Sequence, residues 1–179
     1  MKKKKGQVWI ETVIYTLIAF VMIGLVLAFA RPKISEIQDN VIISQSIKII
    51  EDIDATILNI QSGGQGNKRI LEIGIKKGTL KIDGGNDKII FEVETGQAYS
   101  EPGNEIEEGN LNILTQTHGS AYNVTITRDY STSHDIHYQG QNEVGIISKA
   151  PSPYKISITN EGTVTEETEI KTEINFEVI

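Results

Sequence analysis

The chain has no cysteine and only three histidines among its 179 residues. The absence of cysteine excludes disulfide bonds, thiol catalysis and a cysteine-ligated zinc site. A folded domain of this chain must therefore be stabilised by packing or by its neighbours in an assembly. Basic residues are also scarce, because 24 Asp and Glu outnumber 17 Lys and Arg and give a net charge of −7. This acidic balance argues against a nucleic-acid partner.

Residue patterns typical of catalytic, cofactor or metal sites are also lacking. The glycines follow no phosphate-loop spacing with Lys and Ser or Thr. His134 and His137 are spaced like metal ligands, but on a strand they would point to opposite faces. Only a loop would let both converge with Asp135 or Asp129. We therefore expect a protein without a catalytic site, a cofactor or a bound metal.

One long hydrophobic run stands out against this composition. From Thr12 to Ala30 no residue is charged, and a helix over this run would span about 28 Å, close to the thickness of a bilayer's hydrocarbon core. Four lysines, Lys2 to Lys5, precede the run, whereas Arg31 and Lys33 follow it. The heavier basic cluster favours the cytoplasmic side. The run thus predicts a single membrane-spanning helix with its N-terminus inside and the rest of the chain outside.

The residues between the lysines and the hydrophobic run follow a more specific pattern. Gly6-Gln7-Val8-Trp9-Ile10-Glu11 resembles the type IV prepilin processing site, particularly its archaeal (class III) form. In that family a short basic leader ends in a small residue, and Glu occupies the fifth position of the mature chain. The resemblance covers residues 2 to 30. It implies a leader over residues 1–6, cleavage after Gly6 by a prepilin peptidase, and a mature chain that begins at Gln7.

Glu11 is the residue of this pattern with the clearest physical consequence. A carboxylate in lipid costs about 2 to 3 kcal/mol at the bilayer centre and less near its edge, so Glu11 calls for a partner. The resemblance implies that this partner is the N-terminal amine of Gln7 in a neighbouring subunit. Loss of the leader would also remove four lysines and change the net charge from −7 to −7 − 4 = −11.

The resemblance implies a structural subunit, a pilin, of an extracellular type IV pilus-like filament. Its partners would be other copies of itself, the prepilin peptidase, a pilus assembly ATPase, a membrane platform protein, and the membrane before assembly, with no nucleic acid. Two alternatives remain open. One is a pseudopilin or minor pilin of a secretion or tip complex, and the other is an uncleaved single-pass membrane protein with a ligand-binding β head.

An amphipathic pattern extends the predicted helix over 7–61, of which 12–30 would form the membrane or filament core. Apolar residues recur at three- and four-residue spacing, first at Ile34, Ile37 and Val41 and then at Ile50, Ile53, Ile57 and Ile60. We expect the second group to pack on the protein's own head, with Asp39 and Asp54 among the charges on the opposite face. Pro32 predicts a kink or a short unwound stretch. The glycine-rich segment 62–67 predicts a flexible turn that ends the helix.

From Lys68 to Ile179 the pattern changes to the period of two that is typical of strands. Strands are predicted over 70–75, 79–82, 88–94, 112–117, 122–128, 144–148, 154–159 and 169–178, the first three as a meander. Segment 95–110 is predicted as a loop, and 129–141 as a loop or an edge strand. Ile170, Ile174, Phe176 and Val178 are expected to share one face. The predicted fold is α+β, a long helix followed by an all-β head, either a small antiparallel sandwich or barrel-like.

A glycosylation sequon lies on one of the predicted strands. Asn123-Val124-Thr125 is an N-x-[S/T] sequence with a permitted middle residue. Because Tyr122, Val124 and Ile126 would form one face of the strand, Asn123 is expected to face solvent. We therefore predict Asn123 as a candidate glycan site, which is a common feature of the family that the N-terminus resembles.

Overall fold

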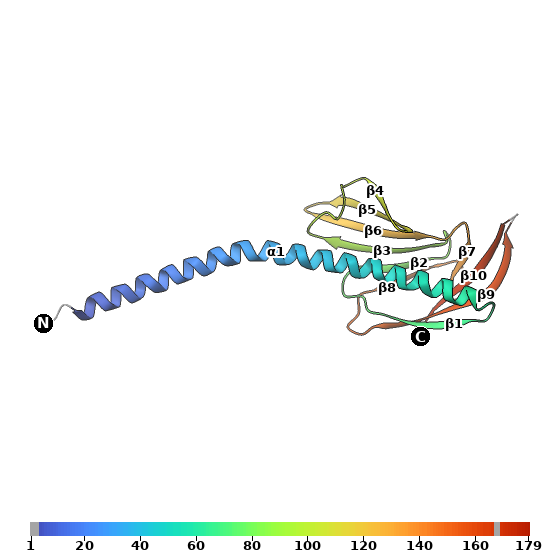
Figure 1. The fold of residues 1–179 in the computed structure, drawn as a ribbon, viewed down its shortest axis with the longest axis horizontal. Coiled ribbons are helices and arrows are strands. Elements are labelled where there is room, and N and C mark those ends of the chain that lie inside the picture. The colour runs from blue at the N-terminus through green and yellow to red at the C-terminus, as the bar shows by residue number, and fades with distance from the viewer. Residues whose placement is uncertain (1–3, 167–168) are drawn as a thin grey trace. The chain divides into compact units, whose positions relative to one another are not determined.

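The computed structural model describes residues 4–166 and 169–179, which form one helix followed by ten strands (Figure 1). The helix is α1 (Lys4–Ser62), and the strands are β1 (Lys68–Ile73), β2 (Thr79–Asp83), β3 (Lys88–Thr95), β4 (Glu105–Glu108), β5 (Leu111–His118), β6 (Ala121–Asp129), β7 (His134–Tyr138), β8 (Val144–Ser148), β9 (Tyr154–Glu166) and β10 (Glu169–Val178). This element order confirms the predicted α+β class. The chain divides into two compact units, Met1–Gln38 and Asp39–Ile179.

The helix α1 passes through Pro32 without a break in its helical conformation. A proline removes one hydrogen bond of the helical ladder, but the short unwound stretch expected here is not formed. The helix ends where the sequence predicts. The amides of Gly63 and Gly64 donate to the carbonyls of Ile60 and Gln61, and Gly64 has a φ of 80° that favours glycine.

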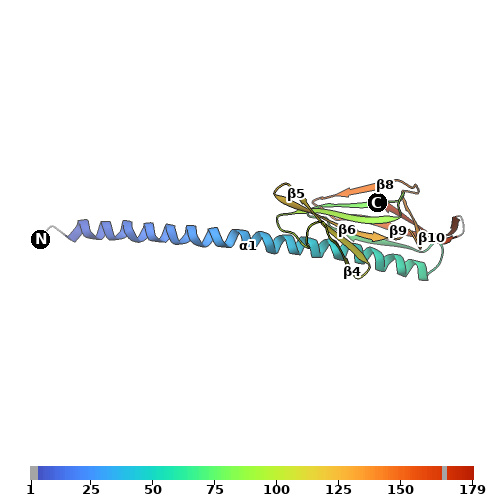
Figure 2. The ribbon, with the colours of Figure 1, turned by 90° about the horizontal axis from the view of Figure 1, so that it is seen from above.

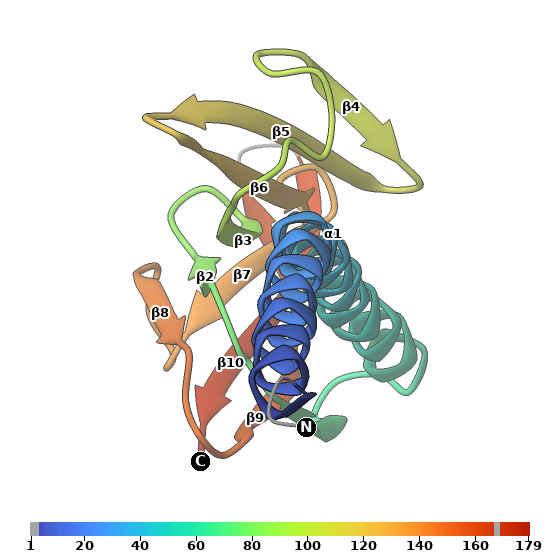
Figure 3. The same cartoon turned by 90° about the vertical axis from the view of Figure 1, so that its left-hand side faces the viewer.

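Two sheets make up the rest of the second unit, one with the strand order β1-β9-β10-β7 and the other with the order β4-β5-β6-β3-β2-β8 (Figure 3). All pairings are antiparallel except that of β7 with β10. The sheets are not closed into a barrel, so of the two predicted arrangements of the head the barrel-like one is wrong. The predicted meander is wrong, because β1 pairs with β9 in one sheet while β2 pairs with β3 in the other.

Some strands differ from their predicted limits. β4 lies inside the segment 95–110 that was expected to be a loop, and β9 extends to Glu166 rather than ending at Thr159. In β10, Ile174 and Phe176 are fully buried but Ile170 is 74% exposed. The register between β10 and β9 shifts between Glu173 and Ile174, where β9 contributes one extra residue, Glu161. Ile170 therefore does not share the burial that was expected for this set of residues.

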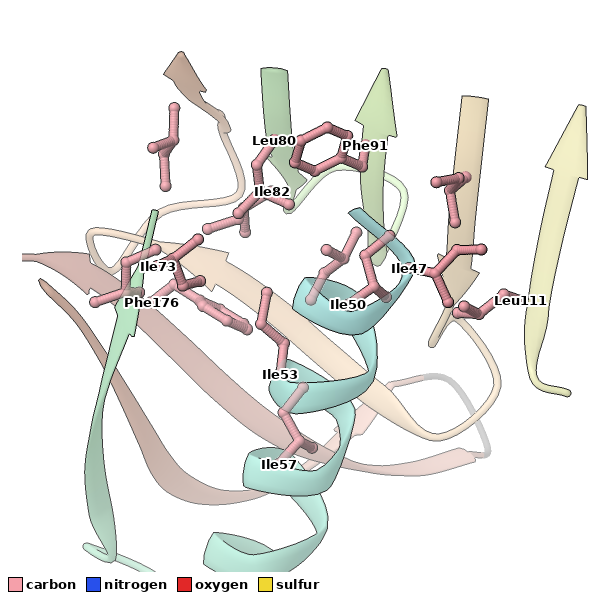
Figure 4. Close-up of a cluster of buried hydrophobic side chains, with 14 of the residues drawn as sticks. Ile47, Ile50, Ile53, Ile57, Ile73, Leu80, Ile82, Phe91, Leu111 and Phe176 are labelled. Carbon is pink, nitrogen blue, oxygen red and sulfur yellow. The ribbon is translucent and has the colours of Figure 1, made fainter. Parts of the chain in front are cut away.

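A single hydrophobic core joins the second half of α1 to both sheets. This half of the helix runs along the strands (Figure 2), and Ile50, Ile53 and Ile57 point toward side chains of the strands (Figure 4). These isoleucines have no exposed surface, whereas Leu58 on the other side of the helix is 56% exposed. Burial of one such side chain contributes about 1.5 to 3 kcal/mol. The compact unit that holds the sheets therefore begins at Asp39 and includes this part of the helix.

The glycine-rich segment after the helix is hydrogen-bonded to β9. The Gly66 amide donates to the Asn160 carbonyl at 2.7 Å, and the Asn160 amide donates to the Asn67 carbonyl at 2.9 Å. The Gln65 amide group also donates to the Glu161 carbonyl at 2.6 Å. The segment is therefore tethered to β9 by hydrogen bonds.

Candidate assembly and processing sites

The first unit exposes apolar side chains on all sides of α1. Trp9, Leu17, Phe20 and Phe29 are 60 to 76% exposed, and the most apolar window of the helix has a mean hydropathy of 2.7 with none of its residues buried. The helix is long and apolar enough to cross a membrane. Soluble monomers rarely expose such a continuous apolar surface. The segment therefore indicates a membrane anchor or a signal segment, and lipid or protein must cover it.

The residues of the predicted processing site lie at the start of α1. Gly6 and Gln7 belong to the first turns of the helix, whereas Met1 to Lys3 of the predicted leader lie outside the described residues. Glu11 is exposed and lies four residues beyond Gln7, so the two positions share one face of the helix. Cleavage after Gly6, and the pairing of Glu11 with a neighbouring subunit, remain predictions.

Asn123 lies in the middle of the six-stranded sheet. Its strand β6 is flanked by β3 and β5, where Glu94 and Gln116 are its partners in the register. Val124 and Ile126 are fully buried, while Asn123 and Thr125 are partly exposed on the other face. The expected orientation of the sequon is therefore present, and its glycosylation remains a prediction.

The histidines do not converge. His134 is buried, and its Nδ1 lies 2.8 Å from the Ser133 hydroxyl. His137 lies between two carboxylates, with Nε2 3.4 Å from Asp135 and Nδ1 2.8 Å from Glu173. Within residues 4–166 and 169–179, no group of three or more His, Asp or Glu side chains could hold a metal ion.

A polar cluster inside the head anchors α1 to the six-stranded sheet and was not predicted from the sequence. The Arg128 Nε and the Tyr130 hydroxyl each donate to the Asp54 carboxylate at 2.9 Å. The Arg128 guanidinium lies 4.9 Å from the centre of the Tyr130 ring, and the His134 ring packs edge-on against that ring at 5.4 Å. Asp54 is only 17% exposed, so its predicted position on a solvent face is wrong.

Burial and Asp54 set the ionisation of this cluster. Burial raises the pKa of Tyr130, and the charge of Asp54 raises it further. Burial disfavours the charged form of Arg128, but the hydrogen bond and charge of Asp54 outweigh it and raise the pKa. Burial also lowers the pKa of His134. At neutral pH the cluster therefore contains an Asp54–Arg128 ion pair, a neutral phenol and a neutral imidazole.

A second anchor lies at the start of this unit. Asp39 is 5% exposed; its carboxylate accepts a hydrogen bond from the Gly96 amide at 2.7 Å and lies 3.4 Å from the Lys77 ammonium. The prediction that Asp39 faces solvent is therefore wrong. Both anchors join residues that are far apart in the sequence, so helical periodicity alone gives no signal for them.

Comparisons with protein-family models, with curated proteins and with solved structures found no match to this chain. The function must therefore be argued from the architecture. A long N-terminal apolar helix followed by a β head is consistent with a pilin-like protein.

Proposed function

We propose that the protein is a pilin, a structural subunit of an extracellular type IV pilus-like filament. One observation carries the proposal: α1 has two different surfaces. Residues 43–60 bury a single apolar stripe in the head, whereas residues 9–29 are exposed, present apolar side chains on all sides of the helix and carry no charge apart from Glu11. The exposed segment needs lipid in a precursor and other helices in an assembly. The protein acts in this proposal as a building unit and not as an enzyme.

Assembly would exchange lipid for helix contacts around the apolar segment. Because lipid tails are already apolar, the favourable free energy of assembly must come from close packing and from polar pairing between helices. Glu11 is the acidic residue of this segment, and the Gln7 ammonium produced by cleavage would be its partner in a neighbouring copy. Loss of one member of a buried ion pair costs about 3 to 5 kcal/mol. We infer that Glu11 is needed for assembly and that a prepilin peptidase, an assembly ATPase and a platform protein act on the chain.

The test compares Glu11→Gln with the wild-type chain and with Glu51→Gln. The control makes the same chemical change at an exposed position of α1 within the head. N-terminal sequencing of the wild-type protein should begin at Gln7 or its cyclised form. Electron microscopy of sheared surface material should show fibres for the wild type and the control, and few or none for Glu11→Gln despite mature subunit in the membrane.

Two results would contradict the proposal. A wild-type chain that begins at Met1 or near Arg31 would exclude prepilin-type processing and favour an uncleaved anchor or ordinary signal cleavage. Normal fibre yield from Glu11→Gln would show that the carboxylate has no pairing role in assembly.

A further inference from the structure

Two of the four edge strands of the head, β1 and β4, carry opposite charge. β4 pairs only with β5, and β1 pairs only with β9, so each is the last strand of its sheet. An edge strand presents backbone amides and carbonyls that no strand of its own sheet satisfies. The two edges lie on opposite sides of the head (Figure 1).

The β4 edge is acidic. Glu101, Glu105 and Glu107 are exposed, and no Lys, Arg or His side chain of the described residues lies within ion-pair distance of them. The sequence between Thr95 and Thr127 contains no lysine or arginine. This side of the head therefore carries negative charge that the chain itself leaves unneutralised.

The β1 edge is basic at its start. Lys68 and Arg69 are exposed; Lys68 lies 3.4 Å from Glu177, but Arg69 has no carboxylate within ion-pair distance among the described residues. A shallow groove of about 510 Å³ runs beside this strand. It is lined by Arg69, Ile70 and Leu71 of β1 and by Asp52, Ala55, Thr56 and Asn59 of α1. The groove gives space along the open edge, and Ile70 is 59% exposed there.

The charges distinguish between the possible pairings of these edges. Two β4 strands would place glutamates opposite each other, and two β1 strands would place Lys68 and Arg69 together. Like charges on paired strands are destabilising, whereas opposite charges are stabilising. β8 is also an edge strand but has no charged residue. The fourth edge strand, β7, is buried over His134, Asp135 and Ile136, and its Ile136 amide already donates to the Asp87 carboxylate at 2.8 Å. The combination that the charges favour is β4 with β1.

We propose that the open edge of β1 in one copy binds β4 of a second copy as an added strand. Main-chain hydrogen bonds would provide the contact, the Arg69 guanidinium would face the β4 carboxylates, and Ile106, which is 37% exposed, would supply an apolar contact. Because the two edges differ, the contact is head-to-tail and repeats from copy to copy. The inference rests on the proposed function only in that a filament brings the copies together.

The absence of cysteine makes a crosslinking test specific. Full-length chains with Ile70→Cys and Ile106→Cys, carrying different tags, are produced together, and membranes and surface fibres are treated with a short bis-maleimide. A mixed dimer is expected only when both cysteines are present, because paired strands lie about 5 Å apart. Val144→Cys, an exposed position on the uncharged edge β8, replaces Ile70→Cys as the control and should not react with Ile106→Cys.

Charge exchange tests the basis of the pairing. Arg69→Glu should lower the crosslinked fraction about fivefold, as expected when one cross-strand pair changes from opposite to like charge. Adding Glu107→Arg to the partner chain should restore it. Lys149→Glu is the matched control, because Lys149 is exposed on the same head and the change in net charge is identical. It should leave the crosslinked fraction unchanged.

The outcomes separate this inference from the proposed function. Crosslinking of Ile106→Cys to Val144→Cys as readily as to Ile70→Cys would overturn the inference, as would an Arg69→Glu chain that crosslinks normally. Fibres that form without the β1–β4 crosslink would also overturn it and leave the proposed function intact. A crosslink in membranes of cells that make no fibres would support the edge pairing and contradict the filament.

Discussion

Substitution of Ile53 by alanine measures how much of the head's stability depends on α1. Ile53 is fully buried between the helix and the strands (Figure 4). The carbons lost contribute about 0.8 kcal/mol each, and together with the cavity they leave the cost is about 3 to 4 kcal/mol. The total free energy of unfolding of a small domain is about 5 to 15 kcal/mol. A single substitution should therefore remove a large part of the stability.

Leu58→Ala is the matched control for this substitution. It removes a similar volume from the same helix, but Leu58 is 56% exposed, so the loss should stay below about 1 kcal/mol. Alanine has a slightly higher helix propensity than both residues, so propensity cannot explain a loss at Ile53. The assay is urea unfolding of a soluble fragment over residues 39–179, followed by circular dichroism, with comparable m-values in both variants.

Equal effects of the two substitutions would refute this reasoning. If Ile53→Ala lost no more free energy of unfolding than Leu58→Ala, α1 would not be part of the folded core of the head. A large loss at both positions would place the control side chain in the core as well and would contradict the one-sided burial of the helix.

Two further predictions concern the same unit. A fragment beginning at Lys68 should be far less stable in urea than one beginning at Asp39, because it lacks the buried helical stripe; equal urea midpoints would contradict this. The pKa of His134 is lowered from its ordinary value of 6.5, chiefly by burial, so the unfolded chain binds its proton more readily. The contribution of neutral His134 to the free energy of unfolding should be fully present above pH 6.5 and should be lost as the pH falls below that value. Urea unfolding between pH 7.5 and 5 should therefore depend less on pH in His134→Gln than in the wild type.

The sequence predicts the elements of this fold better than their partners. The spacing of Ile50, Ile53, Ile57 and Ile60 identifies the buried face of the helix, and alternation of apolar residues locates most strands. Periodicity shows which side chains share a face, but it does not show which strand lies beside them. For this reason β1 and β2 are detected as strands, while their separation into two sheets is not.

Charge at single positions was the least predictable feature of the candidate sites. Asp39 and Asp54 occupy the charged side of the helical pattern, yet both are largely buried. Their partners, the Gly96 amide and the Arg128 and Tyr130 side chains, lie far away in the sequence. A buried carboxylate is stable only with such partners, and long-range pairing of this kind leaves no local pattern. By contrast, the apolar segment before Asp39 can be recognised from the sequence, because its apolar composition alone shows that lipid or protein must cover it.

The two surfaces of α1 also limit where copies of the chain can pack through this helix. From Ile43 onward the apolar stripe is buried in the head, so these side chains are not available to a neighbouring helix. Ile34 and Ile37 are 53 and 62% exposed and are the last apolar positions before the buried Asp39. Val41 is also 49% exposed. Apolar helix contacts between copies should therefore involve residues before Ile43, and contacts beyond that point should be made by the surfaces of the heads.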